Sequence, residues 1–168
     1  MKAKNFTTLD TAAADLEWPV YVAGADIDPN GKAVEMRHTR MLGTIASAEL
    51  SALLAAAPIC ALPSRYEPFG LCALEAALSG CALVVGDIPS LRENWNDAAL
   101  FVPPAEASTL NGALGELIAG RKLRDGLAQR AFHRARGFDS RTMGGAYLEV
   151  YRNLMQGRVS HEELAYAS

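Results

Sequence analysis

The stretch ICALPSRYEPFGLCALEAALSGCALVVG, residues 59–86, predicts a strand, a loop, a helix and a second strand in that order. Its two apolar runs, Ile59–Leu62 and Ala82–Gly86, are typical of strands that are buried on both faces. Between them, residues 70–79 have the apolar spacing of a helix, and Gly80 is a common helix end. Two parallel strands are joined by a helix in this way, so the stretch predicts an α/β fold with a parallel sheet.

The same alternation of short strands and helices continues on both sides of this stretch. Upstream we expect a helix over residues 5–17, strands over 20–24 and 39–42, a turn over 26–31, and a helix capped by Ser47 that runs to about residue 57. Downstream we expect a helical turn over 89–94, a strand over 99–102, and helices over 107–119, 122–136 and 141–156.

Length and composition indicate one folded domain over residues 1–168. Half of the residues are hydrophobic and 21% are charged, and a chain of this size buries most of its apolar surface in one core. We expect a doubly wound, Rossmann-like parallel sheet with helices on both faces. Residues 140–168 are expected to form a C-terminal helix and tail that wrap back over the sheet.

The charge balance and the apolar runs argue against several partners and locations. A net charge of -3 gives no broad positive field for a nucleic acid. The apolar runs are too short to cross a bilayer, and the first residues lack the apolar core of a secretory signal. The three cysteines, Cys60, Cys72 and Cys81, lie in or beside apolar runs and are odd in number. We therefore expect a cytoplasmic protein with no transmembrane segment and no nucleic-acid partner.

The loop after Leu62 is the richest candidate site. Ligands of open parallel sheets bind outside the carboxyl ends of the strands, and this loop leads from such an end into a helix. Pro68 suits the first position of that helix. The N–H groups of the next four residues would then point out of the helix start and form an anion cradle; these residues are Phe69, Gly70, Leu71 and Cys72.

Two carboxylates flank this cradle. Glu67 lies at the positive end of the helix, where a carboxylate is favoured and can accept hydrogen bonds from sugar hydroxyls. Glu75 lies four residues after Leu71, so the two share one helix face. The spacing therefore allows two carboxylates to bracket one phosphate site. Arg65 and Arg92 are further cations that could reach it.

The segment from Glu67 to Glu75 matches the E-x7-E motif of retaining GT-B glycosyltransferases of the GT4 type, also called group 1. The match extends to Pro63-Ser64 before the motif and to residues 87–93 and 97–102 after it. Nearly the whole chain resembles the C-terminal, nucleotide-sugar-binding domain of that family. The resemblance implies transfer of a sugar, with retention, from a nucleoside-diphosphate sugar to an unknown acceptor.

The resemblance also implies roles for individual residues. The first motif glutamate of the family lies by the donor sugar, which makes Glu67 the catalytic candidate, and the second, Glu75, would bind the ribose hydroxyls. The backbone amides of residues 69–72 would hold the diphosphate. The pair Lys4-Asn5 resembles a Lys-Gly or Lys-Asn pair of the family, so Lys4 would neutralise the diphosphate. No metal or other cofactor is implied.

Two parts of the family pattern have no counterpart in residues 1–168. They are the first, central strand with the arginine of its Gly-Arg-Leu segment, and the N-terminal domain that binds the acceptor. We therefore expect that domain to be missing or carried by another chain, and the isolated chain to be inactive in transfer. The strands next to the missing one would have unpaired edges, so we also expect self-association or low stability.

Two other function classes were weighed against this one. A nicotinamide-dependent oxidoreductase is disfavoured, because Gly24-Ala25-Asp26 is not followed by a G-x-G-x-x-G turn. A non-catalytic α/β nucleotide-binding or interaction module remains the alternative. In that case Glu67 is a charge at a helix start, while Lys4 and Glu75 are solvated side chains.

Overall fold

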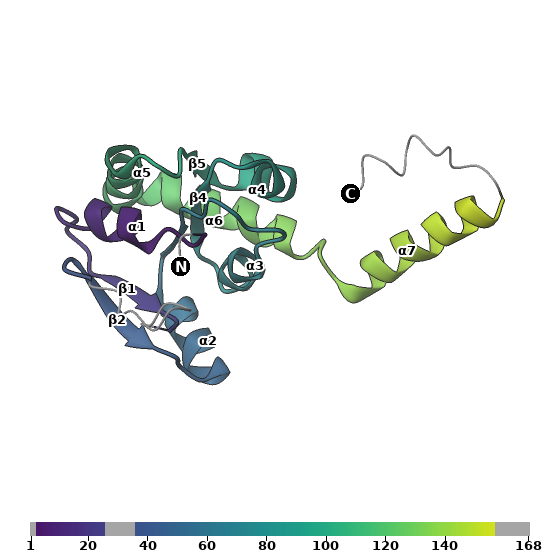
Figure 1. Ribbon diagram of the computed structural model, residues 1–168, viewed down its shortest axis with the longest axis horizontal. Helices are drawn as coiled ribbons and strands as arrows, with labels where there is room; N and C mark the ends of the chain where they lie inside the picture. The colour runs from purple at the N-terminus through teal and green to yellow at the C-terminus, as the bar shows by residue number, and fades with distance from the viewer. Residues whose placement is uncertain (1–2, 26–35, 157–168) are drawn as a thin grey trace. The chain divides into compact units, whose positions relative to one another are not determined.

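The computed structural model describes residues 3–25 and 36–156 and divides the chain into two compact units, Met1–Ala135 and Arg136–Ser168 (Figure 1). The turn predicted over residues 26–31 lies outside the described residues. The elements of the first unit are, in order, α1 (Phe6–Ala12), β1 (Val20–Ala23), β2 (Thr39–Gly43), α2 (Ser47–Ala56), β3 (Ile59–Leu62), α3 (Leu71–Leu78), β4 (Ala82–Gly86), α4 (Pro89–Trp95), η1 (Asn96–Ala98), β5 (Leu100–Val102), α5 (Ala107–Ala119) and α6 (Arg121–Ala135).

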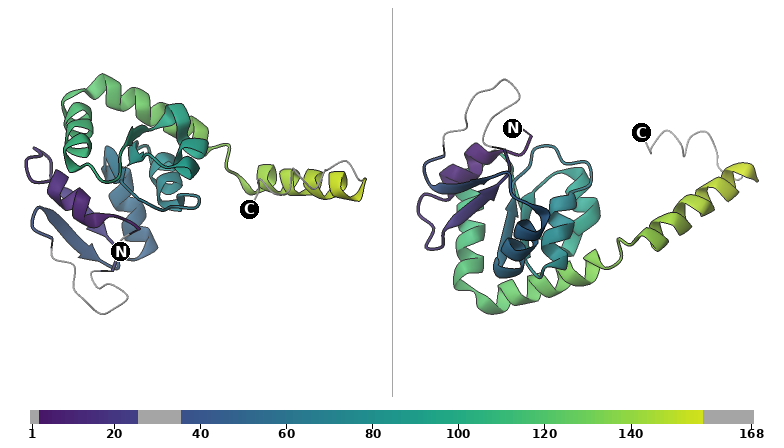
Figure 2. Two further views of the ribbon diagram at one scale, coloured as in Figure 1. Left: turned by 45° about the horizontal axis from the view of Figure 1, so that its top comes forward. Right: turned by 90° about the horizontal axis from the view of Figure 1, so that it is seen from below.

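All strand pairs of the described residues are parallel, and helices flank the strands (Figures 1 and 2). The strands form a two-stranded sheet, β1-β2, and a three-stranded sheet with the order β3-β4-β5. Cys60 lies opposite Leu83, and Val84 lies opposite Leu100. The predicted α/β class with parallel strands is confirmed. In the three-stranded sheet, β3 is joined to β4 through α3, and β4 to β5 through α4 and η1, as parallel pairing requires.

The core is centred on β4, which is buried at all five positions. Strands pair with β4 on both edges, and α3, α5 and α6 contact it. Leu110, Leu117 and Leu127 of the helices complete this core and are at most 1% exposed. In contrast, β3 is only half-buried at all four positions, although its sequence is equally apolar. The difference follows from its neighbours, because among the described strands β3 pairs on one edge only.

A buried carboxylate joins α1 to the start of β2. Asp10 accepts hydrogen bonds from the N–H groups of Arg37, His38 and Thr39 at 2.9–3.1 Å, and from the Thr39 hydroxyl at 2.9 Å. Burial alone would raise the pKa of Asp10, but these donors outweigh it and hold the pKa below its usual value. The contact fixes the entry of the chain into β2.

Two predicted helix boundaries are wrong. The first helix ends at Ala12, followed by turns, and not at residue 17. The helix at residues 47–57 is capped by Ala46 and not by Ser47, which is its first residue. The Glu49 carboxylate accepts the Ala46 N–H at 3.0 Å, which is the glutamate half of a capping box, while the alanine cap has no side-chain oxygen to supply the other half.

The second unit contains α7 (Ser140–Met155), where a helix was predicted. Asp139 caps it by accepting the N–H groups of Arg141 and Thr142 at 2.8 and 2.9 Å, and the bonds to Thr142 lower the pKa of Asp139. The wrapping of residues 140–168 over the sheet stays a prediction. Within the described residues, no helix combines the length and hydropathy that a membrane span requires.

Candidate anion-binding site at the start of α3

The loop between β3 and α3 reaches the helix through Gly70, which has a left-handed backbone with a φ of 88°. A Cβ at this position would lie 3.0 Å from Cδ2 of Leu91, so both the backbone conformation and the space favour glycine. The left-handed residue delays the helix, which begins at Leu71. The prediction that Pro68 occupies the first helical position is therefore wrong.

The first turn of α3 presents backbone donors. The first hydrogen bond of the helix runs from the N–H of Leu74 to the carbonyl of Gly70 at 3.0 Å. The N–H groups of Leu71, Cys72 and Ala73 therefore have no acceptor within the helix. Leu71 and Cys72 are exposed, so a ligand can approach this positive helix end. The predicted cradle residues Gly70, Leu71 and Cys72 thus lie at the helix start.

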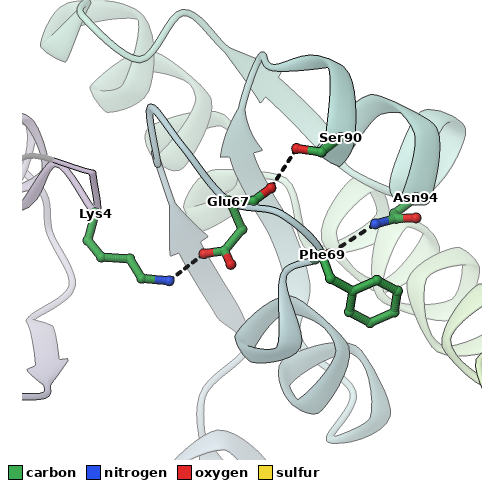
Figure 3. Close-up of polar contacts among 5 residues, drawn as sticks. All are labelled: Lys4, Glu67, Phe69, Ser90 and Asn94. Carbon is green, nitrogen blue, oxygen red and sulfur yellow. Dashed lines mark hydrogen bonds and ion pairs between the residues drawn. The ribbon is translucent and has the colours of Figure 1, made fainter. Parts of the chain in front are cut away.

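Phe69 lies before the helix, in the loop. Its carbonyl accepts a hydrogen bond from the side-chain amide of Asn94 in α4 at 2.9 Å (Figure 3). This bond ties the loop to α4 just before the left-handed turn at Gly70. The structure therefore assigns Phe69 a position beside the cradle, outside the helix that the sequence predicted to contain it.

Glu67 is held by two elements that are distant in sequence. It is only 9% exposed, and its carboxylate forms an ion pair with the ammonium group of Lys4, 63 residues away (Figure 3). Its carbonyl accepts the Ser90 hydroxyl of α4 at 2.5 Å. A buried carboxylate requires such a partner, and the two predicted charged site residues are thereby brought together.

Asn5 holds the segment that carries Lys4. Its side-chain amide donates to the carbonyl of Pro63 at 2.9 Å and to that of Pro104, which follow β3 and β5. Its side-chain oxygen accepts from Nε of Arg65 at 3.2 Å, and the Arg65 N–H donates to the carbonyl of Ala3 at 2.8 Å. Asn5 has a φ of 60°, a conformation that asparagine tolerates better than most residues.

Glu75 lies one turn after Leu71 on α3, and both side chains are exposed. This agrees with the shared helix face that the spacing predicts. The ribose role of Glu75 stays a prediction.

The two candidate arginines form hydrogen bonds with other side chains of the first unit. Arg65 fixes Asn5, as described above. Arg92 forms a two-pronged contact with Asp87 at 2.5 and 2.7 Å and lies over the ring of Phe101, 4.5 Å from its centre. The hydrogen bond from Arg92 lowers the pKa of Asp87. Arg92 therefore orders the segment after β4 through Asp87 and Phe101.

Sequence reasoning missed Asn5, Ser90 and Asn94 as site-building residues. Ser90 and Asn94 lie in the short helix predicted after β4. Because the carboxyl ends of the parallel strands β3 and β4 meet at one edge of the sheet, the sequence could have predicted that this helix lies near the loop after β3. For Asn5 the sequence gives only its position next to Lys4. Among the described residues, no group of three His, Cys, Asp or Glu side chains could hold a metal.

The fold and this site define a parallel α/β domain that presents helix amides and a Lys-Glu pair beyond the carboxyl ends of its strands. The family model for "Glycosyl transferases group 1" matches residues 30–134. The chain belongs to this family, and the resemblance to its C-terminal domain is confirmed.

Known relatives and solved structures agree with this assignment. Glycogen synthase of Mycobacterium tuberculosis is 34% identical over 134 residues, which are 78% of this chain and 32% of that protein. The chain spans about a third of the length of that protein and of the related D-inositol 3-phosphate glycosyltransferase of Kineococcus radiotolerans.

Two solved structures illustrate the likeness. The C-terminal domain of the group 1 glycosyl transferase LpcC of Francisella tularensis is 25% identical, with a TM-score of 0.71 over 82% of this chain and 80% of that one. HepE of Anabaena, solved with UDP and glucose, is 20% identical, with a TM-score of 0.79 over 91% of this chain and 46% of that one. The second likeness shows the GT-B fold alone.

Proposed function

We propose that this chain is the donor-binding domain of a retaining, GT4-like glycosyltransferase that uses a nucleoside-diphosphate sugar. The observation that carries the proposal is the pairing of Lys4 with Glu67, which lies in the loop just before the exposed residues Leu71 and Cys72 at the start of α3. A diphosphate is the ligand that suits a helix start with a lysine next to it. The complex of HepE with UDP and glucose supports a donor of this class in a domain of the same fold.

The proposed reaction breaks the bond between the anomeric carbon and the terminal phosphate oxygen of the donor. The oxygen keeps the bonding electrons, so negative charge develops on the leaving diphosphate. The amides at the start of α3 and the Lys4 ammonium would stabilise that charge without a metal. The acceptor hydroxyl forms the new bond to the same face of the sugar, and its proton passes to the departing diphosphate oxygen. Glu67 is proposed to position the sugar, and Glu75 to bind the ribose.

This arrangement provides one side of a reaction site. Transfer requires that donor and acceptor are held together where water is excluded. We therefore propose that an acceptor-binding domain, in the same polypeptide or on another chain, completes the site, and that residues 1–168 alone catalyse no transfer. A soluble, cytoplasmic location remains part of this proposal.

Isothermal titration calorimetry of the chain with UDP, ADP and GDP tests donor binding. Binding of at least one diphosphate is expected, with loss of affinity in Lys4→Met and unchanged affinity in Lys122→Met, an exposed lysine of α6. If none of the three binds to the folded chain, the donor-binding proposal fails and the alternative of a non-catalytic interaction module is favoured.

A further inference from the structure

Two side chains of α4 hold the loop of the candidate site by its carbonyl groups. The Ser90 hydroxyl donates to the carbonyl of Glu67 at 2.5 Å, and the side-chain amide of Asn94 donates to the carbonyl of Phe69 at 2.9 Å (Figure 3). Ser90 and Asn94 are separated by one helical turn, so they lie on the same face of α4. The position of α4 therefore determines where both carbonyl groups are held.

The bond from Asn94 also orients the peptide group between Phe69 and Gly70. In a planar trans peptide the carbonyl and the N–H group point in opposite directions. Because Asn94 fixes the direction of the Phe69 carbonyl, the N–H of Gly70 points away from Asn94. That N–H is one of the predicted cradle donors, and the left-handed Gly70 also determines where α3 begins. Asn94 therefore controls a donor of the candidate site from outside the cradle.

The carboxyl end of α4 is held in turn by Arg134 of α6. Nε of Arg134 donates to the carbonyl of Asn94, and Nη2 donates to the carbonyl of Glu93 at 2.8 Å. The last carbonyl groups of a helix have no N–H partner within that helix, so they are available to such donors. The donors of a planar guanidinium have a fixed fork geometry that suits two adjacent acceptors. Arg134 therefore fixes both the position and the direction of this helix end.

Asn94 joins the two contacts in a single residue. Its carbonyl accepts from Arg134, which lies 40 residues later in the sequence, and its side-chain amide donates to the loop. Hydrogen bonds weaken steeply as their distance and angle depart from the optimum. A shift of the carboxyl end of α4 would therefore weaken the bond to Phe69 and release the peptide group before α3.

We propose that Arg134 is a positioning residue of the candidate site. It fixes the carboxyl end of α4, and through the Asn94 amide it orients the Phe69–Gly70 peptide group and the donors at the start of α3 for a diphosphate. This inference rests on the proposed donor binding. A loop that is ordered in advance lowers the entropy cost of binding, so the loss of Arg134 should weaken binding although Arg134 itself touches no part of the ligand.

The first test is calorimetry of the full chain with UDP, ADP and GDP, in which affinity is compared for each diphosphate that binds. Arg134→Met removes both donors and should weaken binding about fivefold. Asn94→Ala should have an effect of the same size. The control is Arg130→Met, which removes the same charge one turn earlier on α6. Arg130 donates to the carbonyl of Asp97 in η1 at 2.8 Å, so its loss should leave affinity unchanged.

A double variant separates positioning from stability. Arg134 donates to backbone carbonyl groups, which remain in Asn94→Ala, so Arg134→Met should lower the urea midpoint equally in both backgrounds. Its effect on affinity requires the Asn94 side chain. Added to Asn94→Ala, it should therefore weaken diphosphate binding by no more than about a further twofold. A purely structural role of Arg134 would instead weaken binding equally in both backgrounds.

The amide signal of Gly70 in heteronuclear NMR spectra of the ligand-free chain reports the orientation of the peptide group directly. Arg134→Met and Asn94→Ala should both shift this signal, whereas Arg130→Met should not. If circular dichroism shows that Arg134→Met does not fold, Arg134→Lys takes its place in every measurement. A lysine keeps the charge but cannot form the planar fork to two carbonyl groups.

Three outcomes would overturn the inference while donor binding stands. They are equal affinity of the unmodified chain and Arg134→Met, equal weakening in Arg130→Met, and additive losses of affinity in the double variant. If none of the three diphosphates binds to the unmodified chain, the proposed function fails. The Gly70 signal then still decides whether Arg134 positions the loop, and an unshifted signal in Arg134→Met would refute it.

Discussion

Replacement of Lys4 by methionine is the most direct test of the proposed donor site. Methionine keeps much of the length and apolar character of the side chain but removes the charge. In the structure, the ammonium group is paired with Glu67, and the Lys4 side chain is 40% exposed. A diphosphate must therefore compete with the buried Glu67 carboxylate for the Lys4 ammonium group, or share it with that carboxylate.

The expected loss of affinity follows from these two contacts. A charge-assisted hydrogen bond contributes about 1.5–3 kcal/mol, and the exposure of Lys4 favours the lower end of this range. Competition from an ion pair subtracts about 0.2–1 kcal/mol. The remainder of about 1 kcal/mol or slightly more corresponds to roughly five- to tenfold weaker binding of UDP.

A double variant separates the direct contact from the effect on Glu67. In Lys4→Met the Glu67 carboxylate is left without its lysine beside an anionic ligand, whereas in Lys4→Met/Glu67→Gln that charge is absent. The double variant should therefore bind UDP more tightly than the single one. Calorimetry at low and high salt should also show a weaker salt dependence in both variants than in the unmodified chain.

Unchanged UDP affinity in Lys4→Met, with the fold confirmed by circular dichroism, would show that Lys4 does not contact the diphosphate. Equal weakening in Lys122→Met would show that overall charge, and not this position, determines the affinity. Either result would refute the assignment of Lys4.

Three further predictions concern the carboxylates of Glu75, Glu67 and Asp10. Glu75→Ala should weaken UDP binding about tenfold or more through lost ribose contacts, and equal calorimetric affinities would contradict the ribose role. Glu67→Gln should leave UDP affinity nearly unchanged or slightly raised, because it removes the carboxylate that competes for Lys4, but it should reduce transfer in a complete enzyme. A large loss of UDP affinity would contradict the assignment of Glu67 to the sugar. Asp10→Ala should lower the free energy of unfolding by about 2 kcal/mol or more, because buried donors lose their acceptor. The pKa of Asp10 is lowered by folding, so its contribution is complete above the unfolded pKa of about 3.9 and is lost as pH falls through the folded pKa. Urea unfolding of the unmodified chain and of Asp10→Ala from pH 2 to 7 tests this pH dependence. An equal loss of stability in acid for the two proteins would contradict it.

Most of the fold could be predicted because its strands are short apolar runs. β3 and β4 were predicted at their observed bounds, and α5 was too. Such patterns report burial directly. Helix starts were less predictable, because they depend on single backbone conformations. Gly70 illustrates this, since its left-handed φ decides where α3 begins and a glycine is compatible with either boundary.

The candidate site was predicted in part for a related reason. The cradle is a continuous segment, so its residues remain neighbours in any fold. The tertiary contacts of Asn5 and Ser90 join loops far apart in sequence, and nothing local distinguishes these residues from other polar ones. The sequence predicted one sheet with an unpaired central position, and the described strands form two sheets, β1-β2 and β3-β4-β5.

The candidate site depends on β3, because the carboxyl end of this strand leads into the loop that carries Glu67. One edge of β3 is fixed by β4, while the loop is held by side-chain bonds from Ser90, Asn94 and Lys4. The site chemistry therefore lies in the loop, whereas the position of the loop is determined by β4, by two side chains of α4 and by Lys4 before α1.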